Sequence, residues 1–258
     1  MSIGRFAVRS LVGIVLGFAT LAAHAAPDEI QVYTEEMDDP GEFGLELHLN
    51  YVPEGRKQPG FAGEMQSHHR LQVTPEFSYG LTRTLEAGLY LPLAISADGT
   101  LYENGLRLRL KYIAPRAEGE RLFWGINAEL GYSPPRISES AMALELRPIL
   151  GYRDDQWLVS FNPILDMDLS SNVSRAPRLE PALKVTHRVS AGTRAGLEYY
   201  GEYGPLHDLL PVGSLTHALY GVVDLDFHGI DMNLGVGHGL KNAEDQWVVK
   251  AIIALPLK

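Results

Sequence analysis

The stretch Gly105–Ile113, GLRLRLKYI, alternates strictly between apolar and basic residues. Successive side chains of an extended strand point to opposite faces. One face would therefore be wholly apolar, and the other would carry Arg107, Arg109 and Lys111. A soluble half-buried sheet could hold these cations in water, whereas a membrane barrel would place the leucines in lipid and the cations in a wet interior.

The same period of two continues from Gly41 almost to the end of the chain. No segment shows helical periodicity, and no boundary divides two domains. A chain of 258 residues fits a single barrel or sandwich. The alternation predicts about twelve strands, near 43–51, 71–79, 85–93, 105–113, 124–132, 142–152, 157–169, 178–189, 194–203, 215–228, 230–238 and 246–257.

The lengths of the connections alternate as well. Those after odd-numbered strands are long, as in 53–68 and 204–214, and those after even-numbered strands are mostly short, as in 153–156. The segment 114–121 is the exception. Outer-membrane barrels have short periplasmic turns and longer external loops, and an even number of strands places both chain ends in the periplasm.

Aromatic residues on the apolar face collect at strand ends, where amphipathic rings meet the two membrane interfaces. One group would lie near the periplasmic side: Phe43, Tyr79, Tyr112, Trp124, Tyr152, Trp157 and Phe227. Tyr51, Tyr132 and Trp247 would lie near the outer side. A soluble sandwich has no reason to sort its aromatics in this way. The sequence therefore predicts an all-β fold, a transmembrane antiparallel up-and-down barrel.

The N-terminus predicts export to the outer membrane of a Gram-negative bacterium. Arg5 and Arg9 precede a short apolar run and the small residues of Ala23–Ala26, which is the pattern of a cleaved signal peptide over 1–26. The apolar run is shorter than the roughly 20 residues that a retained spanning helix needs. An acidic periplasmic leader is expected over 27–40, solvated as charge runs usually are, and the barrel over 41–258.

Composition excludes some functions. Acidic residues outnumber basic ones, 32 to 22, which makes the chain a poor nucleic-acid binder. It contains no cysteine, so the fold does not depend on disulfides.

With the leucines in lipid, the opposite face supplies the lumen. Its predicted lining residues are Glu46, His48, Arg70, Glu86, Arg107, Arg109, Lys111, Asn127, Glu129, Glu145, Arg147, Asn162 and Asp166. Pairing the strands about their turns suggests Arg107 beside Glu129, Arg109 beside Asn127 and Arg147 near Asn162. Such a face could line a pore that selects solutes by charge. It could equally fill a closed interior with ion pairs, since twelve strands lie between a packed and an open barrel.

Several segments of the second half carry a family resemblance: ELRPILGY (145–152), FNPILDMDL (161–169), LEPALKV (179–185), GLEYYGEYGPL (196–206) and GVGHGL (235–240). The chain resembles the exported barrel proteins grouped with the outer-membrane proteins of the meta-pathway of phenol degradation. The resemblance implies an outer-membrane barrel with a transport function and poorly defined substrates. We predict that the barrel passes small polar or aromatic solutes passively, with outer-membrane lipid and the barrel-assembly machinery as partners. The ending Leu255-Pro256-Leu257-Lys258 departs from the terminal aromatic residue of bacterial barrels.

A rim enzyme acting on lipids, either a hydrolase or an acyltransferase, is the second interpretation, and a structural or adhesive barrel is the third. An enzyme would need a nucleophile, a base and an orienting group within hydrogen-bond reach. His48, His187, His217 and His228 are spread over different strands, and Ser78 and Ser160 have no G-x-S-x-G context. No spacing matches a metal motif. We therefore predict no catalytic residues, no metal and no cofactor.

Overall fold

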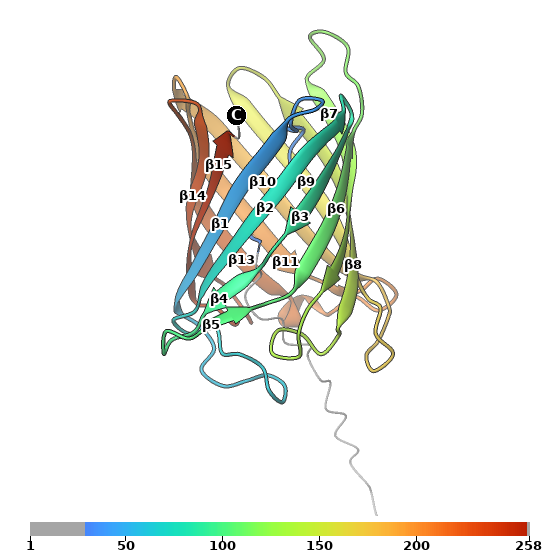
Figure 1. Ribbon diagram of the computed structural model, residues 1–258, viewed down its shortest axis with the longest axis vertical. Coiled ribbons are helices and arrows are strands. Elements are labelled where there is room, and N and C mark those ends of the chain that lie inside the picture. Colours follow the sequence, from blue (N-terminus) through green and yellow to red (C-terminus); the bar gives the residue numbers. More distant parts are fainter. Residues whose placement is uncertain (1–28, 257–258) are drawn as a thin grey trace, which may run out of the picture.

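The protein forms a closed antiparallel barrel (Figure 1) in a computed structural model that describes residues 29–256. The first strand pairs with the second on one side and with the last on the other, which closes the sheet. The predicted signal peptide lies outside the described residues. Among the residues described, no helix is long and apolar enough to cross a membrane.

In the described residues the barrel wall has twelve strand positions around its circumference, as the alternation predicts. The long strands are β1 (Phe43–Glu54), β2 (Leu71–Thr82), β3 (Leu85–Tyr90), β6 (Leu106–Ile113), β7 (Leu122–Tyr132), β8 (Met142–Arg153), β9 (Trp157–Asp168), β10 (Arg178–Ser190), β11 (Thr193–Glu202), β13 (Thr216–Phe227), β14 (Ile230–Gly239) and β15 (Trp247–Pro256). Three short strands continue the long strands at the loop end: β4 (Leu93–Ile95), β5 (Leu101–Glu103) and β12 (Gly204–Pro205). A 3-10 turn, η1 (Val212–Ser214), lies in a loop.

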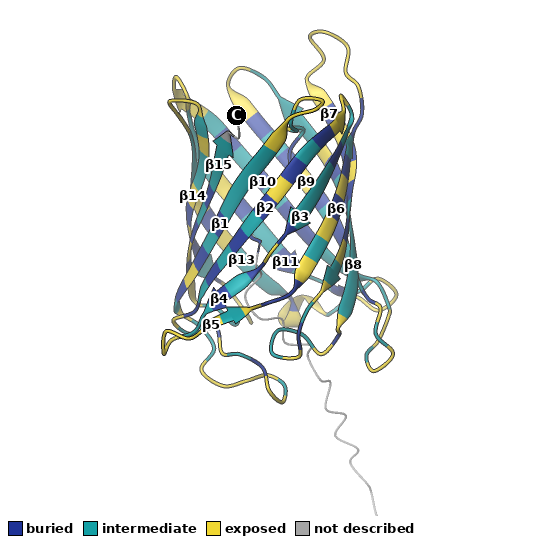
Figure 2. Ribbon diagram, viewed as in Figure 1, coloured by how far each residue is buried: buried dark blue, intermediate teal, exposed yellow. Residues whose placement is uncertain are grey.

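The two faces of the sheet differ in exposure as the period of two requires (Figure 2). Leu108 and Leu110 on β6 are 53% and 48% exposed, whereas Arg109 and Lys111, which alternate with them, are only 8% and 6% exposed. The apolar side chains therefore form the outer surface and the charged ones face inward. This distribution suits a barrel whose outside is lipid and is the reverse of a water-soluble one.

Most long loops gather at one end of the barrel and the short turns at the other, with the C-terminus at the turn end (Figure 1). The long connection 114–121, between β6 and β7, is the exception and lies at the turn end. The loop end carries 55–70, 133–141 and 203–215, and the turn end carries 83–84, 154–156 and 228–229. Aromatic contacts cluster near both ends. Phe43 and Tyr79 lie 4.5 Å apart at the turn end, and Trp247 lies 4.5 Å from His238 at the loop end.

The acidic segment ahead of β1 does not form the expected solvated leader, and that prediction is wrong for residues 29–34. Ile30, Val32 and Tyr33 are at most 3% exposed, inside the barrel. Each joins a different apolar cluster that includes inward-facing residues of the strands, such as Val52, Ile149 and Ala182. The physical reason is that the segment mixes its acids with apolar residues that find apolar partners in the lumen.

Candidate functional site in the barrel interior

The three cations of β6 all face the interior, and each contacts a carboxylate or carbonyl oxygen there. Arg109 Nη2 lies 2.6 Å from a carboxylate oxygen of Glu86 and 2.8 Å from one of Glu76. Gly88, directly opposite Arg109 on β3, leaves space for this guanidinium, because a Cβ there would lie 2.5 Å from Arg109 Nε. Arg109 is therefore held between two strands that precede it in the chain.

Arg107 and Lys111 reach toward the segment 29–40 as well. Arg107 Nη1 lies 3.2 Å from Glu129 and 3.5 Å from Glu29, and Lys111 Nζ donates to the carbonyl oxygen of Glu36. Arg107, Arg109 and Lys111 are thus each paired with carboxylate or backbone oxygens, and they do not present unpaired charges to the lumen.

The expected strand register is wrong by two residues between β6 and β7. Arg109 stands opposite Glu129, and Lys111 stands opposite Asn127. The Arg107–Glu129 contact nevertheless forms, because the long arginine side chain reaches the diagonal neighbour. The Arg147 guanidinium bonds Glu145 at 2.7 Å. It also lies 4.3 Å from the ring centroid of Tyr33, whose backbone is bonded by Asn162. Shifting one strand by two residues keeps every side chain on the same face of the sheet. The alternation of apolar and polar residues alone therefore could not fix the register.

The other predicted lining residues lie at different depths of the interior. Asn127 donates to Glu129 at 2.7 Å near the middle. Asp166 pairs with Arg178. At the loop end, Arg70 is fully buried and donates to the Met65 carbonyl oxygen at 3.2 Å. Glu46 and His48 lie on β1, beside Glu76 of β2.

A second charged cluster lies on β10, β11, β13 and β15, and none of its members is among the lining residues named in the sequence analysis. Lys250 is 1% exposed, pairs with Glu198, and donates to the Ile30 carbonyl oxygen at 2.8 Å. Lys184 lies 3.4 Å from the same carboxylate and 2.7 Å from Asp224. Lys250 alternates with outward-facing neighbours on β15, and this parity is the signal that could have found it.

Tyr33 anchors residues 29–40, which we call the inner segment, to the barrel wall. Its backbone N–H donates to Asn162 Oδ1 at 2.7 Å, and its carbonyl oxygen accepts from Ser160 Oγ and Asn162 Nδ2. Its hydroxyl donates to Glu129 at 3.0 Å and shares a hydrogen bond with the hydroxyl of Tyr90.

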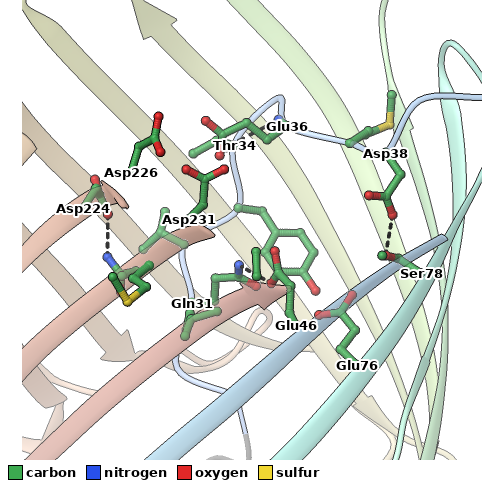
Figure 3. Close-up of a pocket in the computed structure, with 18 of the residues that line it drawn as sticks. Gln31, Thr34, Glu36, Asp38, Glu46, Glu76, Ser78, Asp224, Asp226 and Asp231 are labelled. Carbon is green, nitrogen blue, oxygen red and sulfur yellow. Dashed lines mark hydrogen bonds between the residues drawn. The ribbon is translucent and has the colours of Figure 1, made fainter. Parts of the chain in front are cut away.

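The segment therefore crosses the interior and divides it. On the turn side a cavity of about 780 Å³ remains, lined by both acids and cations. Figure 3 shows Gln31 beside Glu46 and Asp38 bonded to Ser78 in this cavity. On the loop side a smaller cavity of about 70 Å³ lies beside Arg107, Glu129 and Glu145.

The loop end is closed further by the external loop 55–70. Arg56 pairs with Glu64 and, at 2.9 Å, with Glu244 of the β14–β15 loop. Ser67 donates to Asp245 of the same loop. Burial raises the pKa of Glu244 to about 7. These contacts bind two loops together over the barrel mouth.

The residues considered for an enzyme make other contacts. Ser78 bonds Asp38, and Ser160 bonds the Tyr33 carbonyl oxygen. On the outer face, the His187 ring packs 4.5 Å from Trp157, and His217 bonds the hydroxyl of Tyr199. None of these contacts joins a serine to a histidine.

Comparisons with known proteins show the fold. No family model matches the chain, and no curated protein matches it. An outer-membrane channel from Pseudomonas putida F1 is similar with a TM-score of 0.56 and 13% identity, over 89% of this chain and 100% of that one. The NanC porin is similar with a TM-score of 0.53 and 12% identity, over 83% of this chain and 99% of that one. The chain therefore has the fold of the twelve-stranded barrels of the Gram-negative outer membrane.

Proposed function

We propose that this chain is an outer-membrane channel for the passive passage of small polar or aromatic solutes. The observation that carries the proposal is a closed barrel with an apolar outside, a charged inside and a turn-side cavity of about 780 Å³. A cavity of this size is in the range of small-molecule sites. The similarity to an outer-membrane channel and to a porin supports the proposal at the level of the fold.

In this proposal the inner segment controls the path. Solutes entering from the turn side reach Tyr33 and the ion pairs around it, where side chains and backbone fill the cross-section. Passage to the loop side requires residues 29–34 to move. The predicted lining residues, from Glu46 to Asp166, would then contact the solute and select it by charge.

The first test is single-channel conductance of the refolded mature chain in planar bilayers, with reversal potentials under a salt gradient. We expect discrete steps with defined ion selectivity. Replacing Arg107, Arg109 and Lys111 together by Ala should shift selectivity toward cations, because three positive charges leave the lumen. The control replaces the cations Lys57, Arg175 and Lys241 of the external loops by Ala, and should leave selectivity nearly unchanged.

A specific observation favours a second candidate, a structural barrel with a filled lumen. The middle of the interior is occupied by the segment and by buried ion pairs, including Lys250–Glu198. This candidate predicts a folded, inserted and silent protein, both as the mature chain and after removal of residues 27–40. Silence in both forms would overturn the channel.

A further inference from the structure

Three ligand-bearing side chains converge on the inner wall near the turn-side cavity. Glu46 and His48 lie on β1 and Glu76 lies on β2, and Glu46 is the direct cross-strand partner of Glu76. His48 Nε2 lies 3.1 Å from Glu76 Oε2 and 3.7 Å from Glu46 Oε2. One ligand atom from each of the three lies within 4.8 Å of the others.

These separations suit a metal ion of zinc type. Zinc binds histidine nitrogen and carboxylate oxygen at about 2.0–2.2 Å, in tetrahedral geometry. Two ligands of such a tetrahedron lie roughly 3.3 Å apart, between the two distances that His48 Nε2 makes. Glu46 and Glu76 also line the turn-side cavity, so water has access to a fourth position.

A cation between Glu46 and Glu76 would stabilise the barrel wall. Like charges directly opposite each other on neighbouring strands destabilise a sheet, and Glu46 faces Glu76. Arg109 does not meet this need alone, because it contacts Glu76 Oε1 and is shared with Glu86. The Oε2 atom of Glu76 is left directed at His48.

Neighbouring groups orient the ligands in the way that outer-shell partners of metal sites do. Arg109 fixes Glu76 through its other oxygen, and Gln31 of the inner segment donates to Glu46 Oε2 at 3.3 Å. His48 is fully buried, and in the described chain its Nδ1 has no hydrogen-bond partner. Its polar contacts are therefore made through Nε2.

We propose that Glu46, His48 and Glu76 form a binding site for a divalent transition-metal ion, with Zn²⁺ as the probe. The site goes beyond the proposed channel function and does not depend on it. The bound ion would link β1 to β2 and, through Glu46, lie next to the inner segment.

The test is Zn²⁺ titration of the chelator-treated, refolded mature chain by isothermal calorimetry at neutral pH. We expect one Zn²⁺ per chain. His48→Gln and Glu46→Gln should each weaken binding roughly tenfold or more, as loss of a supporting or ligating group does at metal sites. The control variant is His68→Gln/His69→Gln, which removes the paired histidines of the external loop and should leave the lumen site intact.

A second measurement keeps the proposal falsifiable if His48→Gln does not fold. Co²⁺ in place of Zn²⁺ should give the intense visible absorption of a four-coordinate ion in the wild type and lose it in Glu46→Gln. No binding to the folded wild type would overturn the site. Binding that survives in both lumen variants and is lost in the loop variant would also overturn it. Conductance plays no part in these readings, so they stand apart from the test of the channel.

Discussion

The turn-side cavity and the middle of the barrel are lined by the same strands, yet one is open and the other is filled. The turn-side cavity has a volume of about 780 Å³, whereas the cavity beyond the inner segment, on the loop side, has a volume of about 70 Å³. Alternation along the strands is the same in both regions. The difference comes from the segment 29–40.

Within that segment, the residues that reach the middle differ from those near the turns. Ile30, Val32 and Tyr33 bury apolar surface against the wall, while Glu36 is exposed near the turn end. Burial of apolar side chains is the main favourable term in packing. Apolar packing of these residues therefore acts together with the hydrogen bonds of the segment backbone, such as Lys250 to the Ile30 carbonyl oxygen, to fill the middle of the barrel.

Removing residues 27–40 should have the largest effect, because it makes the two regions alike. The interior groups that the segment satisfies would be hydrated, and a continuous water path would form. We expect a large rise in single-channel conductance relative to the mature chain.

The control for this deletion is a scrambled segment of the same composition, which keeps the charge but not the positions of Ile30, Val32 and Tyr33. It should also conduct more than the wild type. Equal conductance of the wild type and the deletion would show that the segment does not close the path.

Lys250→Met should destabilise the barrel next most strongly, because Lys250 holds the segment and the wall together. The change leaves the buried Glu198 with one cationic neighbour, Lys184 at 3.4 Å, and with hydrogen bonds from Tyr200 and Asn233. Breaking a buried pair in this way costs about 3 kcal/mol. Urea unfolding in lipid vesicles, followed by tryptophan fluorescence, measures the loss. Lys241→Met, in an exposed loop, is the matched control and should change the free energy of unfolding by less than about 0.5 kcal/mol.

Tyr33→Phe should loosen the segment without emptying its pocket. It removes the hydroxyl that bonds Glu129 and Tyr90 and keeps the ring, at a cost of about 1–2 kcal/mol. Hydrogen exchange of the amides of residues 30–34 should speed up by roughly tenfold. Tyr51→Phe on the outer face should leave these amides unchanged. Unaltered exchange in Tyr33→Phe would mean that apolar packing alone anchors the segment.

The smallest effect concerns pH at the loop end. Burial raises the pKa of Glu244 to about 7, from 4.5, so the folded loop binds a proton that the unfolded loop has released between these values. By linkage, the loop arrangement loses stability as pH rises through this range. The protection factors of the loop amides, which correct for the intrinsic exchange rate at each pH, should therefore be higher near pH 5 than near pH 8, and Glu244→Gln should flatten the difference. Glu118→Gln, in the 114–121 turn, should not.

Most of the fold could be predicted from the sequence, and the interior could be predicted in part. Leu108 and Arg109 alternate over a few residues, so their opposite faces follow from backbone geometry alone. Glu46, Glu129 and Arg147 lie on the inward face for the same reason. The register between β6 and β7 could not be fixed, because a shift of two preserves every face. Lys250 shows how the same rule finds a residue when it is applied to every strand.

The sequence by itself determined the strand pattern, the apolar outside and the charged inside, because each depends on residues a few positions apart. Only the tertiary structure decided which charges meet, as in Arg109 with Glu76 and Lys250 with Glu198, and whether the lumen is open. Closing the barrel brings β1 next to β15, and it places an acidic segment beside cations more than a hundred residues away. Contacts between residues so far apart in the sequence arise from the closed shape of the sheet, and they cannot be predicted from local periodicity.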